Sequence, residues 1–128
     1  MIAAPGAVHA LRPISILVVS SDDLFSGRLV DEAGASGVTL SRVPAGANLE
    51  VALAQSGANV VLLDVGDALG RDARVVTAFA ALHPDVPVVA AAERPAAPTF
   101  CGVPMLDKWR STDRLLADIE LAYLGLLR

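Results

Sequence analysis

Cysteine and positive charge are both scarce in this sequence. The single cysteine, Cys101, cannot form an internal disulfide, which favours a reducing cytoplasm and argues against a metal site built from cysteines. The 14 acidic residues outnumber the 10 basic ones, giving a formal net charge of −4, and the arginines are scattered along the chain. Because nucleic-acid binding requires a continuous basic surface, we expect no direct contact with nucleic acid.

Long hydrophobic runs are also absent, although 54% of the residues are hydrophobic. The apolar residues occur in short runs, whereas a membrane-spanning helix needs roughly 20 consecutive apolar residues. The segment GDALG, residues 66–70, has the wrong spacing for a dinucleotide-binding fingerprint or a phosphate-binding P-loop. We therefore expect a soluble, cytoplasmic protein that does not associate with a membrane.

The length of the chain, 128 residues, predicts one domain with a single hydrophobic core. Residues 1–13 lack the basic start of a signal peptide and are expected to form a flexible N-terminal tail. Residues 14–128 then form the domain, and no internal repeat or linker divides it.

Short apolar runs alternate with segments of helical periodicity along this domain. The alternation is typical of an α/β protein, in which helices cover both faces of a parallel sheet. Because Pro95 and Pro98 interrupt the segment before the last strand, we expect the fourth helix to be shortened. The predicted strands lie within residues 14–23, 37–43, 58–67, 86–92 and 103–106, and the predicted helices at 24–34, 48–57, 71–83 and 111–127.

Charged residues follow several of the predicted strands at the point where each strand ends. Asp22 and Asp23 follow the first strand, Asp64 closes the third, and Lys108 follows the fifth. Singly, these residues have ordinary explanations as helix caps, a turn residue and a surface cation. Together they would meet at the sheet edge where α/β proteins bind ligands. Converging carboxylates repel one another unless a cation compensates them, and Mg²⁺ prefers such oxygen ligands.

These residues give the chain a resemblance to the receiver domains of bacterial two-component response regulators. The resemblance covers residues 14–127 and depends on SDD at 21–23, VVLLD at 60–64 and the lysine after the fifth strand. It implies a flavodoxin-like, doubly wound sheet of five parallel strands in the order 2-1-3-4-5. It also implies a phosphorelay role, with a histidine kinase or a phosphotransfer protein as the partner.

The resemblance further implies a role for each charged residue. Asp64 would accept the phosphoryl group, and Lys108 would pair with Asp64 and then with a phosphoryl oxygen. Mg²⁺ would be bound directly by Asp23 and mainly through water by Asp22, with Asp64 and the carbonyl of Gly66 as further ligands. Lys108 is the only lysine beside nine arginines. A compact ammonium can follow a moving oxygen, which a planar guanidinium does less well.

The chain departs from the receiver pattern at the residues that normally report phosphorylation. The hydroxyl residue at the end of the fourth strand is replaced by Ala92, and the aromatic residue before the lysine is replaced by Met105. Arg94, two residues beyond Ala92, is the one nearby group that could partly replace the hydroxyl. The chemistry of phosphoryl transfer is thus expected to be retained while its usual readout is lost.

Three functions remain open from the sequence. The first is an atypical single-domain receiver that is phosphorylated on Asp64, with self-phosphorylation and autodephosphorylation but no small-molecule turnover. The second is a phosphorylation-independent pseudo-receiver that acts as a protein-interaction module. The third is a Mg²⁺-dependent phosphohydrolase. It is the weakest of the three because no acid or base accompanies the nucleophile. A downstream protein partner is expected in the first two cases, and the face of the last helix could mediate a homodimer.

Overall fold

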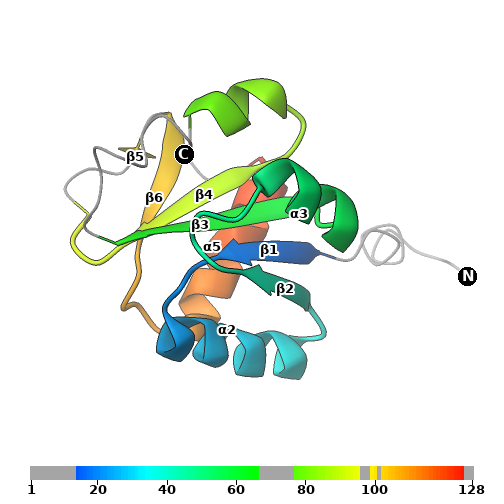
Figure 1. Ribbon diagram of the computed structural model, residues 1–128. Helices are drawn as coiled ribbons and strands as arrows, with labels where there is room; N and C mark the ends of the chain where they lie inside the picture. Colours follow the sequence, from blue (N-terminus) through cyan, green and yellow to red (C-terminus); the bar gives the residue numbers. More distant parts are fainter. Residues whose placement is uncertain (1–13, 67–76, 96–98, 101, 126–128) are drawn as a thin grey trace, which may run out of the picture.

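The computed structural model describes residues 14–66, 77–95, 99–100 and 102–125. The predicted N-terminal tail, residues 1–13, lies outside the described residues. The described chain forms one central sheet with helices on both of its faces (Figure 1). The strands are β1 (Ser15–Val19), β2 (Thr39–Val43), β3 (Val60–Gly66), β4 (Val88–Ala92), β5 (Thr99–Phe100) and β6 (Val103–Asp107). The helices are α2 (Asp23–Ser36), α3 (Leu49–Ser56) and α5 (Thr112–Tyr123), and residues 77–82 are also helical.

The sheet has the strand order β2-β1-β3-β4-β6-β5, and the pairs β1–β2, β1–β3, β3–β4 and β4–β6 are all parallel. The expected five-stranded parallel sheet with the order 2-1-3-4-5 is therefore confirmed, with β6 as its fifth strand. Central strands of such sheets are buried on both faces and have continuous apolar sequences. The sequence VVAAA of β4, in which every residue is buried, follows this rule.

The connection between β4 and β6 differs from the prediction. None of its described residues is helical, so the shortened fourth helix is not found among them. Instead, β5 pairs with β6 in the antiparallel direction, with Thr99 opposite Pro104 and Phe100 opposite Val103. Gly102 permits the tight return between the two strands because its φ angle of 84° is one that other residues rarely adopt. A two-residue strand is too short to show a periodic pattern, and it exists because it forms hydrogen bonds with β6. The local sequence therefore did not predict it.

Two hydrophobic clusters hold the layers together, one on each face of the sheet. Alternate residues of a strand point to opposite faces, so Ile16 and Val18 of β1 pack with α2 and α5, whereas Leu17 and Val19 pack on the side of α3 and residues 77–82. The two pairs of helices lie on opposite sides of the sheet in Figure 1. None of the described helices combines the length and apolar character that a bilayer-spanning helix requires.

Candidate functional site

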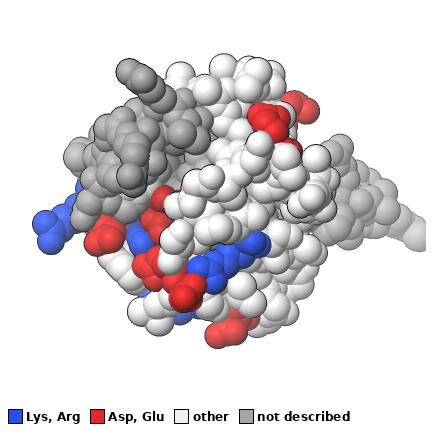
Figure 2. Space-filling model, in the orientation of Figure 1, with Lys and Arg blue, Asp and Glu red and all other residues white. Residues whose placement is uncertain are grey.

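The candidate site lies at the carboxyl ends of the parallel strands. It combines the residues that follow β1, the end of β3 and Lys108, which comes directly after β6. Figure 2 shows acidic side chains with basic side chains between them on the side toward which these strands point in Figure 1. This is the edge at which open α/β sheets bind ligands.

Lys108 joins two carboxylates at this edge. Its Nζ atom lies 2.9 Å from Oδ2 of Asp64 and 2.8 Å from Oδ2 of Asp22, and only 4% of its side chain is exposed. The backbone N–H of Lys108 donates to the carbonyl of Ala92 at 2.8 Å, which extends the pairing of β6 with β4 and fixes the start of the side chain. The predicted meeting of Asp64 with Lys108 is thus present in the structure.

The groups around the Lys108 ammonium offset the cost of burying its positive charge. Burial works against the charged form, but the hydrogen bonds to Asp22 and Asp64 outweigh it, and the pKa of Lys108 is raised above its ordinary value. The ammonium also lies 5.3 Å from the centroid of the Phe25 ring and 5.2 Å from that of Trp109, within the range of cation–π attraction. A compact ammonium is therefore held between two carboxylates and two aromatic rings.

Asp64 is placed by the end of β3 and is almost buried, with 7% of its side chain exposed. In the ladder with β4, Asp64 pairs with Ala91 and Gly66 with Ala92, so Val65 is an additional residue that shifts the register. Oδ2 of Asp64 accepts hydrogen bonds from both Lys108 Nζ and the Ser20 hydroxyl, the latter at 2.7 Å.

Ser20 is a site residue that the sequence reasoning missed. It is the first residue after β1, its exposed fraction is 0%, and its hydroxyl donates to Asp64. The sequence pattern drew attention to the aspartates of SDD. However, β1 ends at Val19, so the serine directly after it is the residue that lies beside the end of β3. Locating the last strand residue would have been the signal for Ser20.

Asp22 caps the helix that follows β1. Its Oδ1 atom accepts from the backbone N–H of Phe25 at 3.1 Å, while its Oδ2 atom faces Lys108. The hydrogen bond from Lys108, followed by that from the Phe25 backbone, lowers the pKa of Asp22 below its ordinary value of 3.8. Asp22 therefore has both the structural role of an N-cap and a place beside Asp64.

Asp23 lies in a different setting from its neighbour. It is the first residue of α2, 88% of its side chain is exposed, and its Oδ1 atom forms an ion pair with Nη2 of Arg42 from β2. Arg42 was not foreseen from the sequence. Within the described residues, no group of three or more His, Cys, Asp and Glu side chains is arranged to hold a metal ion. The structure thus brings Asp22, Asp64 and Lys108 together and leaves Asp23 apart.

The positions of the usual phosphorylation readout are apolar and packed. Ala92 and Met105 are 1% and 8% exposed and belong to the core cluster on the α3 side of the sheet. Arg94 is exposed beyond the end of β4, and no hydrogen bond or ion pair connects it to another described residue.

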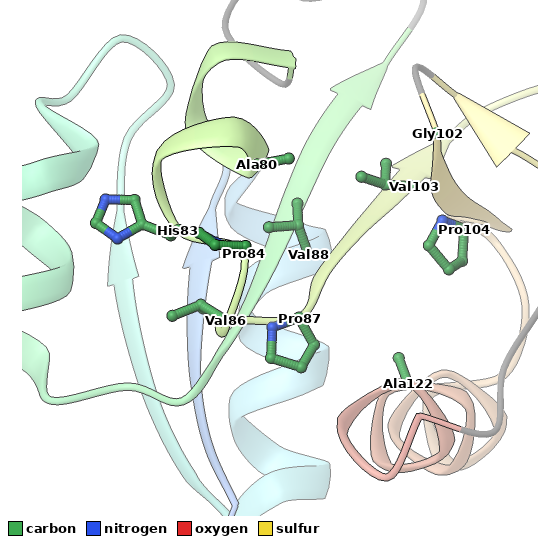
Figure 3. A pocket seen from close by; sticks show the side chains of 10 residues that line it. All are labelled: Ala80, His83, Pro84, Val86, Pro87, Val88, Gly102, Val103, Pro104 and Ala122. Carbon is green, nitrogen blue, oxygen red and sulfur yellow. The ribbon is translucent and has the colours of Figure 1, made fainter.

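A hollow elsewhere in the molecule is a poorer candidate for a site. It lies at the amino ends of β4 and β6, the opposite ends from Asp64, and is lined mostly by apolar and proline side chains, with His83 at its rim (Figure 3). His83 is already paired with Glu50 through its Nε2 atom at 2.7 Å. Among the described residues, no further charged side chain lines this hollow beside His83.

Asp22→Asn is expected to reduce the pH dependence of stability, since asparagine keeps the helix cap but removes the charge. Folding lowers the pKa of Asp22, so its ionised form stabilises the folded state. This contribution is fully present above pH 3.8 and is lost as the pH falls below 3.8 through the pKa of the folded state. We expect a loss of about 1 kcal/mol at neutral pH that vanishes in acid. Urea unfolding at a series of pH values measures it. Asp23→Asn is the matched control, and an equal effect there would contradict the assignment, because exposed ion pairs contribute little.

Solved structures with the same arrangement of elements include signal receiver domains and response regulators. The signal receiver domain of an HD domain-containing protein from Pseudomonas fluorescens matches with a TM-score of 0.71 at 17% identity, over 90% of this chain and 98% of that one. The chemotaxis response regulator CheY4 of Vibrio cholerae matches with a TM-score of 0.66 at 15% identity, over 87% and 99% of the two chains. The chain has the fold of a response regulator receiver domain.

A third solved structure shares this arrangement of elements at similarly low sequence identity. HP1043, an orphan response regulator of H. pylori, matches with a TM-score of 0.67 at 15% identity, over 86% of this chain and 96% of that one. No protein-family model and no curated protein matches the sequence. In this receiver fold, the cluster of Asp22, Asp64, Lys108 and Ser20 occupies the carboxyl edge of the sheet.

Proposed function

We propose that the chain acts in two-component signalling as an atypical receiver that accepts a phosphoryl group on Asp64. The observation that carries this proposal is the pairing of Asp64 at the end of β3 with the buried ammonium of Lys108, at 2.9 Å. A carboxylate beside a fixed cation is suited to nucleophilic attack on a phosphoryl group, because the cation can stabilise the charge that develops on the phosphoryl oxygens.

The transfer requires few groups besides these two. One carboxylate oxygen of Asp64 attacks phosphorus, an O–P bond forms, and the bond between phosphorus and the donor breaks, with its electron pair leaving on the donor. The negative charge of the Asp64 carboxylate is thereby replaced by charge on the phosphoryl oxygens. Lys108, with a flexible stem and three donors, can keep one contact with Asp22 while another turns to a phosphoryl oxygen. No small-molecule turnover beyond self-phosphorylation and autodephosphorylation is expected.

The acidic groups at this edge fit a hard divalent cation such as Mg²⁺. Asp22 and Asp64 face the same ammonium, so their two carboxylates leave a negative charge that Lys108 alone does not balance. Mg²⁺ usually binds through one or two carboxylates together with waters and a phosphate, for which this pair and the carbonyl of Gly66 are suited. When bound, the ion would neutralise phosphoryl charge. For Asp23, the ion pair between its Oδ1 atom and Arg42 would compete with binding of the ion.

Asp22→Asn is expected to weaken Mg²⁺ binding more than Asp23→Asn, which reverses the order that the resemblance implies for the two aspartates. The reason is that Asp22 already lies beside Asp64 through Lys108, whereas Asp23 is exposed and paired with Arg42. Isothermal titration calorimetry with MgCl₂, or quenching of the fluorescence of Trp109, measures the affinity. A greater loss in Asp23→Asn would restore the original order and show that Arg42 releases Asp23 readily.

The direct test of the proposed function is the mass of the intact protein after incubation with Mg²⁺ and acetyl phosphate. A receiver that is active in transfer gains the mass of one phosphoryl group, and the gain disappears in alkali-treated or hydroxylamine-treated samples because these nucleophiles cleave acyl phosphates. An unchanged mass, both with acetyl phosphate and with a panel of histidine kinases, would favour a different function for the fold.

That different function is a phosphorylation-independent interaction module. Three observations favour it: Ala92 and Met105 are packed apolar residues in place of the usual switch, and Asp23 is engaged by Arg42. In this case the Lys108 ion pairs would serve stability, and the surface would bind a partner in one constant conformation. Binding of a partner that is unaffected by Asp64→Asn would identify the module.

The partners follow from the proposed chemistry. A histidine kinase or a phosphotransfer protein would supply the phosphoryl group in the cytoplasm, and a downstream protein would recognise the product.

We also propose that a second copy of the chain packs against the exposed face of α5, where Leu121 and the capping residue Leu124 are 38% and 48% exposed. Sedimentation equilibrium with and without phosphorylation measures that association.

A further inference from the structure

A hydroxyl group does reach the proposed phosphoacceptor, but from the opposite side to the one where it is missing. Ala92, at the end of β4, has no hydroxyl, whereas Ser20, directly after β1, donates to Oδ2 of Asp64 at 2.7 Å. β1 and β4 are the two strands that flank β3 in the sheet. The polar contact from a neighbouring strand to Asp64 is therefore made on the β1 side.

The Ser20 hydroxyl both donates and accepts a hydrogen bond in this arrangement. Its hydroxyl has one proton, which is donated to Asp64, and the same oxygen accepts the backbone N–H of Asp22 at 3.0 Å. Asp22 is the N-cap of α2, and its side chain accepts from the N–H of Phe25. A chain of hydrogen bonds thus runs from the Asp64 carboxylate through the Ser20 hydroxyl to the first turn of α2.

The backbone of Ser20 extends the same connection to β2. Its N–H donates to the carbonyl of Val43 at 2.9 Å, and its carbonyl accepts from Nε of Arg42 at 3.4 Å. Arg42 in turn forms the ion pair with Asp23 of α2. On this side of the site, Ser20 thus connects Asp64 to the turn between β1 and α2 and to the end of β2.

We propose that Ser20 is a positioning residue that couples the state of Asp64 to the turn between β1 and α2 and to the end of β2, residues 20–25 and 42–45. These two segments, here called the β1-side surface, would carry the signal that the packed residues Ala92 and Met105 cannot carry. The proposal deepens the proposed function and rests on it for the phosphorylated state.

The physical reason is the loss of charge on the Asp64 carboxylate. A hydroxyl that donates to an ionised carboxylate makes a stronger hydrogen bond than one that donates to a neutral carbonyl or ester oxygen. After phosphorylation, the carboxyl oxygens are neutral and the charge lies on the phosphoryl group. The Ser20 proton therefore turns to a phosphoryl oxygen or weakens its bond, and the N–H of Asp22 and the carbonyl of Ser20 respond because they share that residue. A ligand shifts a conformation only through such differences between states.

Amide hydrogen exchange with beryllofluoride as the phosphoryl mimic tests the proposal. In the wild type, we expect exchange in the β1-side surface to change by about tenfold on addition of the mimic, which corresponds to about 1.4 kcal/mol. Residues 92–109 are expected to change little. A change confined to residues 92–109 in the wild type would overturn the proposal without the need for any variant.

Ser20→Ala removes the coupling, and Ser21→Ala is its matched control. Ser21 is the adjacent serine, and its exposed hydroxyl accepts from the backbone N–H of Ala45 at 2.9 Å without touching Asp64. We expect the difference between mimic-bound and free protein to vanish over the β1-side surface in Ser20→Ala and to persist in Ser21→Ala. If Ser20 were merely structural, Ser20→Ala would alter exchange equally in both states and leave that difference intact, which would refute the coupling.

A second perturbation separates the coupling from phosphorylation itself. Asp64→Asn removes the carboxylate charge without any phosphoryl group, so it should alter exchange in the β1-side surface when Ser20 is present and not in the Ser20→Ala background. If the mimic fails to bind while Asp64→Asn has this Ser20-dependent effect, the proposed function is wrong and the coupling is right. If neither perturbation changes the β1-side surface, the coupling is wrong whatever the phosphorylation result.

Discussion

Lys108→Met is expected to lower the free energy of unfolding by about 3–5 kcal/mol at neutral pH, the largest stability effect of any single change at the site. Methionine keeps most of the side-chain volume but removes the cation between Asp22 and Asp64. The two carboxylates then repel one another, and Asp64, with a side chain that is 7% exposed, is left with little water to compensate its charge. Because 28% of the Asp22 side chain is exposed, the loss should lie toward the lower end of this range.

Denaturant unfolding of the wild type and Lys108→Met over a range of pH measures this effect. The loss should shrink as the pH falls below 3.8 through the lowered pKa of Asp22, because a protonated Asp22 no longer needs a cation. The double variant Lys108→Met, Asp64→Asn is the control, since it removes one of the two repelling charges and should recover part of the stability. A loss below about 1 kcal/mol, independent of pH, would mean that Lys108 is solvated in solution and not held between the carboxylates.

Asp64→Asn is expected to abolish incorporation of a phosphoryl group from acetyl phosphate. Asparagine has nearly the shape of aspartate but lacks the anionic oxygen that attacks phosphorus. Asp31→Asn, at an exposed position of α2, is the matched control and should be labelled like the wild type. Intact-mass measurement over a time course gives both the rate and the extent of labelling. Undiminished labelling of Asp64→Asn would assign the phosphoryl group to another residue.

The lone lysine can be examined in the same assay. Lys108→Arg preserves the charge but replaces a compact ammonium with a wide, planar group whose donors are fixed in one plane. The site between Asp22, Asp64 and the rings of Phe25 and Trp109 has room for the former. We expect labelling of Lys108→Arg to fall by about tenfold or more, equivalent to about 1.4 kcal/mol in the barrier. An unchanged rate would show that any cation suffices at this position.

Much of the fold could be predicted from local patterns. Short apolar runs alternating with helical periodicity predicted five parallel strands covered on both faces, and a parallel sheet requires such crossovers between its strands. The connection from β4 to β6 could not be predicted in the same way. Pro95 and Pro98 argued against a full helix, but β5 exists through its pairing with β6, which a local pattern does not contain.

The meeting of Asp64 with Lys108 was predictable because both residues end parallel strands, and the carboxyl ends of parallel strands share one edge. The fate of the adjacent residues Asp22 and Asp23 was not. The start of α2 makes Asp22 an extended N-cap that faces Lys108 and makes Asp23 the first helical residue, so the two side chains leave the chain in different directions. The aspartates alone do not specify which of them is the cap.

The sequence by itself therefore determined the sheet, the edge that carries the site, and the pairing of the proposed phosphoacceptor with the lone lysine, because these depend on strand periodicity and on the parallel direction of the strands. Only the tertiary structure decided that Ser20 donates to Asp64, that Arg42 engages Asp23, and that Asp22 and not Asp23 shares Lys108 with Asp64. Each of these contacts joins residues from different strands or helices. Their distances depend on strand register and on the first residue of a helix, and a shift of one residue in either would direct a different side chain toward Asp64.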